Sequence, residues 1–316
     1  MGFFSGMLGN KSAKTKSATS LPRTSTATAT RIKNILGIRE LESMPMQAAR
    51  AFQLASDPKA NAADFVKVIE QDEALGSKII RVANSVYFFR GTKATDIEKA
   101  VNNIGLNELR CLLTASMLKS LLISKHPLRK QLWANAIAVG ICCRNLSRTV
   151  ENVGSGEAFL AGLVHDIGKL VMLRKLGNLY EKVLARVSFG ELTFTQAEEE
   201  LFETNHIEIG KWVAESWNFP DPVIYAIGKH HDPFPKDEGN KERHCDLAML
   251  VKSADIIAHA KGLGHPSAFR GFQRMHEEQL AVALARVGIL EANSASFLNN
   301  FLKEYEEEAS MFEMEN

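Results

Sequence analysis

Apolar residues recur at intervals of three and four along most of this chain, from about residue 38 to residue 302. This spacing gathers them on one face of an amphipathic helix, whereas a half-buried strand alternates apolar and polar residues. No stretch keeps a two-residue period for long enough to predict a strand. The pattern therefore predicts an all-α fold built from many helices.

Short polar side chains stand immediately before several helical segments in the first half of the chain. Asn61 precedes AADFVKVIEQ, Asp72 precedes EALGSKIIRVANS and Asp96 precedes IEKAVNNIG. Such residues begin helices because their side chains accept hydrogen bonds from the first turn. We predict that residues 35–127 form an N-terminal helical subdomain, which ends where Pro127 breaks the last helix.

The helices expected over residues 128–302 carry polar residues on faces that are otherwise apolar. The string LVHDIGKL sets His165 beside Asp166 inside one helical run, and Asn135 shares a face with leucine and valine. Burying an unpaired carboxylate or imidazolium costs several kcal/mol, so these side chains need partners from other helices.

Later helices supply further residues of the same kind. His206 lies on an apolar helix face, His230 and His231 fall in the last turn of a helix that starts at Asp221, and Asp255 stands between apolar neighbours. The candidate set is Asn135, His165, Asp166, His206, His230, His231 and Asp255. Histidine and aspartate together suit zinc, manganese, iron or magnesium, and one carboxylate can bridge two ions.

Each of these residues also has a structural interpretation. His206 suits a hydrogen-bonded core histidine, the His230–His231 pair suits the negative end of a helix, and Asp255 can pair with His259 one turn on. Their joint occurrence favours a metal site. Lys169 could contact a phosphate, although a surface lysine with its stem on apolar neighbours is the simpler interpretation.

Several separated motifs occur together in the order of a known family. The H-D-I-G string at 165–168, the later histidines and the final aspartate resemble the HD superfamily of metal-dependent phosphohydrolases. The first half is similar to its HDOD (HD-related output domain) branch, with Met44-Pro45, VIEQDEALGSKIIRVANSVYF at 68–88 and AVNNIGLNELR at 100–110. The match runs from about residue 38 to residue 232, and the helix of Asp255 extends it.

The resemblance implies an HD-domain-like helical bundle behind the N-terminal subdomain. It also implies two metal positions: one with Asp166, His206, His230 and His231, and one with His165, Asp166 and Asp255. Asn135 stands where the superfamily has its first metal-binding histidine, so the second position is degenerate. The chain reads HHDPFPKDEGN where the branch that hydrolyses cyclic di-guanylate has Gly-Tyr-Pro, so that activity is not expected.

The resemblance further implies a bacterial signal-transduction or regulatory protein that acts as an interaction module. Its partner would be a signalling protein or a small nucleotide ligand, and a non-catalytic role is favoured. The alternative is a metal-dependent phosphohydrolase that acts on a nucleotide or a phosphoester. A third hypothesis, a structural scaffold, predicts that the histidine and aspartate positions tolerate alanine.

Composition and charge bear on the protein's partners, on its cellular location and on its two ends. The formal net charge is +1 with interspersed signs, which argues against nucleic acid as the main partner. No apolar run is long enough for a membrane span and no secretory signal is evident, so we expect a cytoplasmic protein. Residues 1–34, rich in Ser, Thr, Ala and Lys, are expected to be a disordered tail, and residues 303–316 an acidic tail.

Overall fold

The structure is a computed structural model. It describes residues 22–43, 50, 53–54, 57, 59–85, 88–121, 126–150, 153–188, 192–234 and 243–312. Every regular element in these ranges is a helix, which confirms the predicted all-α fold. The Met44-Pro45 pair and residues 1–21 and 313–316 of the expected tails lie outside the described residues.

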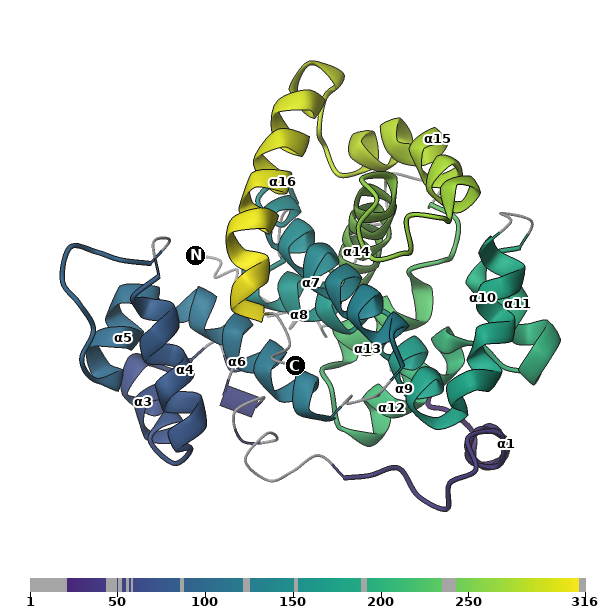
Figure 1. Cartoon of the computed structure of the whole chain (residues 1–316), viewed down its shortest axis with the longest axis horizontal. Coiled ribbons are helices and arrows are strands. Elements are labelled where there is room, and N and C mark those ends of the chain that lie inside the picture. The colour runs from purple at the N-terminus through teal and green to yellow at the C-terminus, as the bar shows by residue number, and fades with distance from the viewer. Residues whose placement is uncertain are drawn as a thin grey trace, which may run out of the picture.

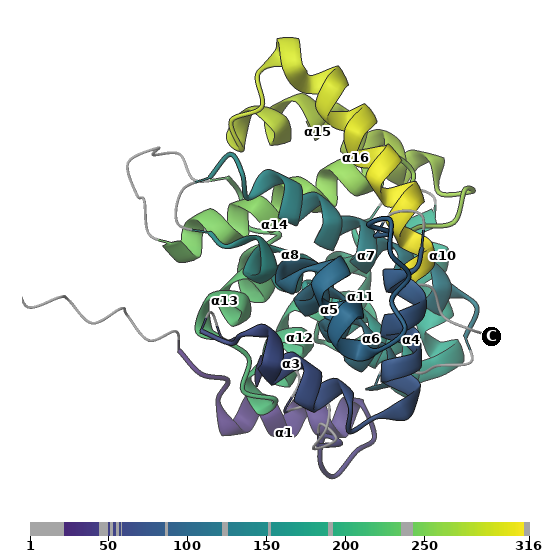
Figure 2. The same ribbon diagram turned by 90° about the vertical axis from the view of Figure 1, so that its left-hand side faces the viewer.

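The first helices form the N-terminal part of the molecule. They are α1 (Thr26–Ile35), α3 (Ala62–Ile69), α4 (Glu73–Ala83), α5 (Ile97–Ile104) and α6 (Leu106–Leu121). The predicted caps are confirmed: Asn61 makes a capping box, and the carboxylates of Asp72 and Asp96 accept hydrogen bonds from backbone N–H groups three residues on. Helices α3–α5 lie at one end of the molecule, and α6 joins them to the rest (Figure 1, Figure 2).

The remaining helices form a bundle around a central pair. They are α7 (Leu128–Leu146), α8 (Ser155–Val164), α9 (Ile167–Leu176), the 3-10 turn η1 (Gly177–Tyr180), α10 (Glu181–Ser188), α11 (Phe194–Phe202), α12 (His206–Ser216), α13 (Asp221–Lys229), α14 (Arg243–Ala260), α15 (Arg270–Arg286) and α16 (Glu291–Phe312). Helices α7 and α8 occupy the middle, and α14 and α16 pack against α7 (Figure 1).

Glycines allow the helices around the centre to approach closely. A Cβ atom on Gly168 would lie 1.9 Å from the carbonyl oxygen of His206, and a Cβ atom on Gly210 would lie 3.3 Å from the backbone nitrogen of Gly168. Helices α9 and α12 therefore touch backbone to backbone. Gly168 and Gly210 permit this contact, which brings His206 next to the turn that holds Asp166.

The C-terminal helix extends beyond residue 302 into the expected acidic tail. The carboxylate of Glu308 is buried and accepts two hydrogen bonds from the Arg144 guanidinium, at 2.6 and 2.9 Å. The backbone carbonyl of Phe312 accepts a hydrogen bond from Trp133 at 3.0 Å. The segment is helical and packed instead of being a solvated tail because the Arg144 guanidinium, on α7, neutralises the buried carboxylate of Glu308.

The N-terminal segment also differs from the expected tail. Helix α1 begins after Ser25, whose hydroxyl accepts the hydrogen bond of Thr28 N–H. Arg31 then donates to the carbonyl oxygen of Glu203 at 2.6 Å and to the carboxylate of Glu208 at 2.5 Å. These long-range contacts, rather than strong periodicity within the segment, hold α1 against the corner between α11 and α12.

No described helix is by itself long and apolar enough to cross a membrane. Helices α15 and α16 reach the necessary length and hydropathy only when they are taken together, and the two are bent by 108°.

Candidate metal centre

The HD pair lies in a turn between two helices rather than inside one continuous helix. Helix α8 ends at Val164, α9 begins at Ile167, and Asp166 has φ −102° and ψ 21°. The expected single helical run is therefore wrong at this point. The non-helical backbone of Asp166 changes the direction of the chain, so the two neighbouring side chains can approach the same buried centre.

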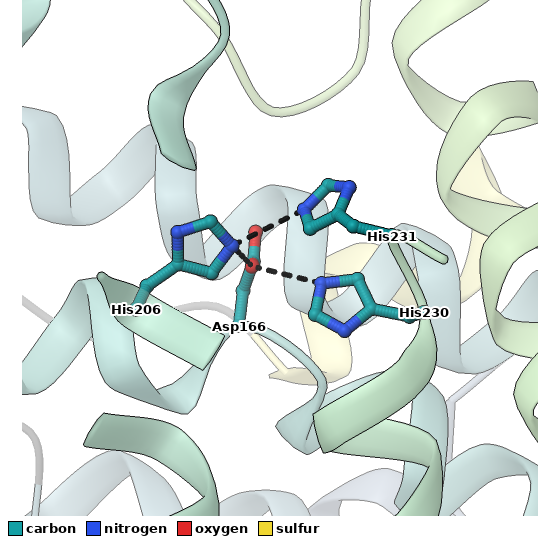
Figure 3. A group of neighbouring side chains, drawn as sticks. All are labelled: Asp166, His206, His230 and His231. Atoms are coloured by element: carbon teal, nitrogen blue, oxygen red, sulfur yellow. Dashed lines mark hydrogen bonds and ion pairs between the residues drawn. The ribbon is translucent and has the colours of Figure 1, made fainter. Parts of the chain in front are cut away.

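One group of ligand-type side chains surrounds the Oδ1 atom of Asp166 (Figure 3). This atom lies 3.4 Å from His206 Nε2 and 3.6 Å from His230 Nε2, and His206 Nε2 lies 3.1 Å from His231 Nε2. Three of the four side chains are buried and that of His231 is exposed. We call Asp166, His206, His230 and His231 the first position. Its four ligand atoms lie within 4.8 Å of one another.

A second group lies on the other side of Asp166. His165 Nε2 is 3.4 Å from Asp166 Oδ2 and 3.4 Å from Asp255 Oδ1, and all three side chains are buried. We call His165, Asp166 and Asp255 the second position. The structure thus brings together all six residues that the sequence predicted as metal ligands, although their role as ligands stays a prediction.

Asn135 is buried beside the second position. Its side-chain nitrogen lies 3.5 Å from His259 Nε2, and the backbone of Gly264 packs tightly over its Cβ atom. His259 Nε2 also lies 3.3 Å from Asp255 Oδ1, which agrees with the predicted pairing of these two residues. An asparagine at this position therefore contacts a histidine from α14.

The residues at the centre fit a metal ion because they leave buried ligand atoms unsatisfied. Among the described residues, His165 Nε2, His230 Nε2, Asp166 Oδ1 and Asp255 Oδ1 have no hydrogen-bond partner. Such orphaned polar atoms are rare in protein interiors and call for an explanation. Divalent cations bind imidazole nitrogens and carboxylate oxygens, so a metal at the first position would satisfy two of the four atoms, His230 Nε2 and Asp166 Oδ1.

The other ring nitrogens fix the orientation of the imidazoles. His165 Nδ1 donates to the carbonyl oxygen of Gly162 at 2.7 Å, and His230 Nδ1 donates to that of Ile227 at 2.8 Å. When the ring is neutral, a proton on Nδ1 leaves the lone pair on Nε2, which is the atom that faces Asp166 in both cases. This is the arrangement that metal-binding histidines adopt.

Lys169 is buried at the centre, so its interpretation as a surface lysine is wrong. Its Nζ atom lies 2.6 Å from Asp166 Oδ2 and 4.6 Å from the centre of the Phe194 ring. The Asp166 carboxylate, three residues earlier and also buried, neutralises the ammonium inside the protein. The ammonium therefore does not have to reach solvent. Contact between Lys169 and a phosphate stays a prediction.

The charges at the centre depend on one another. Burial alone would raise the pKa of Asp166, but the Lys169 ammonium and His165 hold it well below its usual range. Burial alone would lower the pKa of His165, but Asp166 and Asp255 raise it to about 10. Burial lowers the pKa of His259 to about 3 even though Asp255 is adjacent. In the metal-free protein, cationic Lys169 and His165 therefore balance the two carboxylates at neutral pH.

Sequence reasoning missed Glu198, which contacts His206, and Tyr180, which contacts Glu198. The carboxylate of Glu198, on α11, lies 2.6 Å from His206 Nδ1, and its other oxygen accepts the Tyr180 hydroxyl at 2.5 Å. Glu198 stands in the run AEEEL, where nothing distinguishes it from Glu199 and Glu200 except its place on the buried side of an amphipathic helix.

The fold and this centre define an all-helical protein with a buried histidine–aspartate site. A sequence profile of the HDOD domain matches residues 41–233. This match covers more than half of the 316 residues. The chain therefore belongs to the HDOD domain family, as its motifs predicted.

Known proteins with similar sequences or folds agree with this assignment. An HDOD domain protein from Geobacter sulfurreducens matches 91% of this chain and 98% of its own, with 22% identity and a TM-score of 0.72. A Marinobacter aquaeolei VT8 protein, provisionally named a signal transduction protein, matches 90% of this chain and 65% of its own, with 18% identity and a TM-score of 0.72. At these identities the structural likeness shows the fold.

Ribonuclease Y of Lactobacillus gasseri is 31% identical over 149 residues, which are 46% of this chain and 26% of that protein. The curated relatives are much longer than the matched region, because this chain spans between 17% and 38% of their length.

Proposed function

We propose that this protein is a regulatory HDOD module in signal transduction, and that it binds one divalent metal ion at the first position without catalysing phosphoryl transfer. Asp166, His206, His230 and His231 would hold the ion. When bound, the metal supplies a positive charge that ties α12 and α13 to the turn before α9. The metal would thereby stabilise the arrangement of helices that a partner recognises.

The observation that carries this proposal is the different environment of the two oxygens of Asp166. Oδ1 faces the histidines of the first position and has no hydrogen-bond partner among the described residues. Oδ2 accepts a hydrogen bond from Lys169 at 2.6 Å. The first oxygen is free to bind a cation, whereas a lysine ammonium already neutralises the second.

The second position is therefore poorly suited to an ion. A cation there would lie against the Lys169 ammonium, and Asn135 offers only a neutral amide in place of an imidazole. Two-metal phosphoryl transfer requires ions about 3.5–4 Å apart that share the charge of the reacting oxygens. A centre that supports one ion and one lysine favours a binding role over that chemistry.

The signalling role is supported by the comparisons and not by the geometry of the site. The provisional name of the Marinobacter aquaeolei protein agrees with it, and so does the family resemblance. A signalling protein or a small nucleotide as partner, a cytoplasmic location and a bacterial source stay predictions from the sequence.

A metal-dependent phosphohydrolase is the second candidate function. It is favoured by the exposure of His231, because an exposed residue in the first position places that position near the surface, where a phosphate approaches. The sequence similarity to ribonuclease Y adds RNA to the nucleotides and phosphoesters that would be tested as substrates.

Phosphoesterase assays would separate the two functions. Purified protein loaded with manganese or iron would be offered a general phosphodiester, nucleotides and short RNA, beside a His206→Ala variant. The proposal expects no turnover above that of the variant. Hydrolysis that depends on the added metal and disappears in His206→Ala would replace the binding role with the enzymatic one.

A further inference from the structure

We propose that Glu198 and Tyr180 are positioning residues for His206, and that the charge of Glu198 raises the affinity of the first position for a divalent cation. This inference rests on the proposed function, because it concerns the same metal position. It goes beyond it by assigning a role to two residues that no sequence motif identified.

Glu198 is directed at His206 by two hydrogen bonds to the same oxygen. Its Oε2 atom accepts the Nδ1 proton of His206 at 2.6 Å and the backbone N–H of His206 at 2.8 Å. Its Oε1 atom accepts the hydroxyl of Tyr180 at 2.5 Å. All three side chains are fully buried. Two bonds to one residue fix both the position of the backbone and the rotation of the ring.

Glu198 has no arginine or lysine partner within ion-pair distance among the described residues, and its only ion-pair partner there is His206. A buried carboxylate is costly unless other groups compensate its charge. The tyrosine hydroxyl and the backbone N–H compensate part of this charge, and the buried Lys169 ammonium acts on it from a greater distance. Among the described residues only His206 is in ion-pair contact with the carboxylate, so the negative charge acts most strongly on the ring that faces Asp166.

His206 differs in this respect from the two other buried imidazoles at the centre. His165 and His230 donate their Nδ1 protons to backbone carbonyls, which are neutral acceptors. His206 donates to a carboxylate instead. A carboxylate acceptor makes the opposite nitrogen a stronger electron donor to a metal, and loss of such a partner commonly reduces metal affinity about 10- to 100-fold.

The corner between α11 and α12 holds this geometry in place. Asn205 accepts a hydrogen bond from the backbone of Glu208 at 2.9 Å and donates its amide proton to Glu199 at 2.6 Å. Glu203 adopts a left-handed conformation with φ 56° and its carbonyl oxygen binds Arg31 of α1. The carboxylate and the imidazole are thus held on two helices whose connection is itself constrained.

The test compares Glu198→Gln with Glu200→Gln, a matched control on the exposed side of the same helix. Glutamine keeps the size and can still accept the His206 proton, but it lacks the charge. Titration calorimetry with Mn²⁺ alone is expected to show a loss of affinity of about 10- to 100-fold for Glu198→Gln and less than about twofold for Glu200→Gln. Tyr180→Phe is expected to fall between them. Equal affinities for wild type and Glu198→Gln would overturn the proposal.

A second measurement in the metal-free protein keeps this inference separate from the proposed function. Nitrogen-15 spectra of the imidazoles are expected to show His206 protonated at Nδ1 in the wild type, with a proton resonance shifted strongly downfield by the carboxylate. That shift should shrink in Glu198→Gln and persist in Glu200→Gln. If wild type binds no Mn²⁺ but the spectra behave as described, the metal-binding function fails and the positioning role stands. Unchanged spectra in a folded Glu198→Gln protein would refute the positioning role.

Discussion

The ammonium of Lys169 lies 2.6 Å from the Oδ2 atom of Asp166, and both side chains are buried. One residue that the sequence presents as a metal ligand is thus already paired, on one of its two oxygens, with a cation three residues further along the chain, in the first turn of α9. The first position, around Oδ1 of Asp166, therefore has no cation of the protein beside that oxygen among the described residues, whereas the second position, around Oδ2, already contains the Lys169 ammonium.

Replacing Lys169 with methionine removes that internal cation while retaining most of its volume. The metal-free variant is expected to be less stable than wild type by about 3–5 kcal/mol, because Asp166 keeps its charge without its closest partner. Added Mn²⁺ should restore stability, by about 2.7 kcal/mol at a concentration 100 times the dissociation constant. Urea unfolding with and without the metal measures both effects.

Lys175→Met provides the control, because Lys175 is on the same helix and pairs with Glu42 nearer the surface. It should change stability by less than about 1 kcal/mol. A stable Lys169→Met protein whose stability does not respond to metal would show that Lys169 is not the counter-charge of this centre.

His165 gives the metal-free protein a specific dependence on pH. Its pKa is raised from 6.5 in the unfolded chain to about 10 in the folded protein, so the folded state binds the proton more tightly. The resulting stabilisation is complete below pH 6.5 and is lost as the pH rises towards 10. Unfolding free energies measured between pH 6 and pH 10 should therefore fall, and the fall should be smaller in Asp255→Asn. A flat profile would contradict the charge balance described for the centre.

The buried pair of Arg144 and Glu308 connects the C-terminal helix to the core. Glu308→Ala removes both short hydrogen bonds to the buried Arg144 guanidinium, whose contact with Glu304 is longer, at 3.5 Å, and should cost about 3–5 kcal/mol. Glu307→Ala, one residue earlier and more exposed, should cost less than about 1 kcal/mol. Chemical denaturation of the two variants measures the difference. Equal losses would mean that α16 does not depend on this pair.

Restoring a histidine at position 135 is expected to raise metal occupancy at the second position. His259 already lies 3.5 Å from the Asn135 amide, so the new imidazole would compete with it for space. Asn135→His combined with His259→Ala should therefore bind more metal than Asn135→His alone. Calorimetric stoichiometry measures this, and an unchanged value in both variants would show that residue 135 is not placed to serve as a ligand.

Much of the fold and of the candidate site could be predicted from the sequence because both have strong local signals. Asn61, Asp72 and Asp96 cap helices through contacts with their own first turns, which depend only on nearby residues. The ligand-type residues stand out because histidine and aspartate are unusual on apolar helix faces. Gly210 could be interpreted in the same way, since a missing side chain one turn beyond His206 indicates close packing.

The features that the sequence did not predict depend on contacts between distant segments. Lys169 is buried because a carboxylate lies inside the protein, and a sequence pattern shows the lysine without showing where its charge is satisfied. Glu198 is one of three consecutive glutamates, and only its contact with His206 separates it from the others. Helix α16 packs against the core past residue 302 because Arg144, far earlier in the chain, donates two hydrogen bonds to the buried Glu308 carboxylate.

The most direct test of this account is the number of divalent ions that the protein binds. Metal-free protein would be titrated with Mn²⁺ in a calorimeter, with the metal content then checked by elemental analysis. The account predicts one equivalent for the wild type and none for His206→Ala at the same concentrations. Two equivalents in the wild type, or one equivalent that persists in His206→Ala, would contradict it.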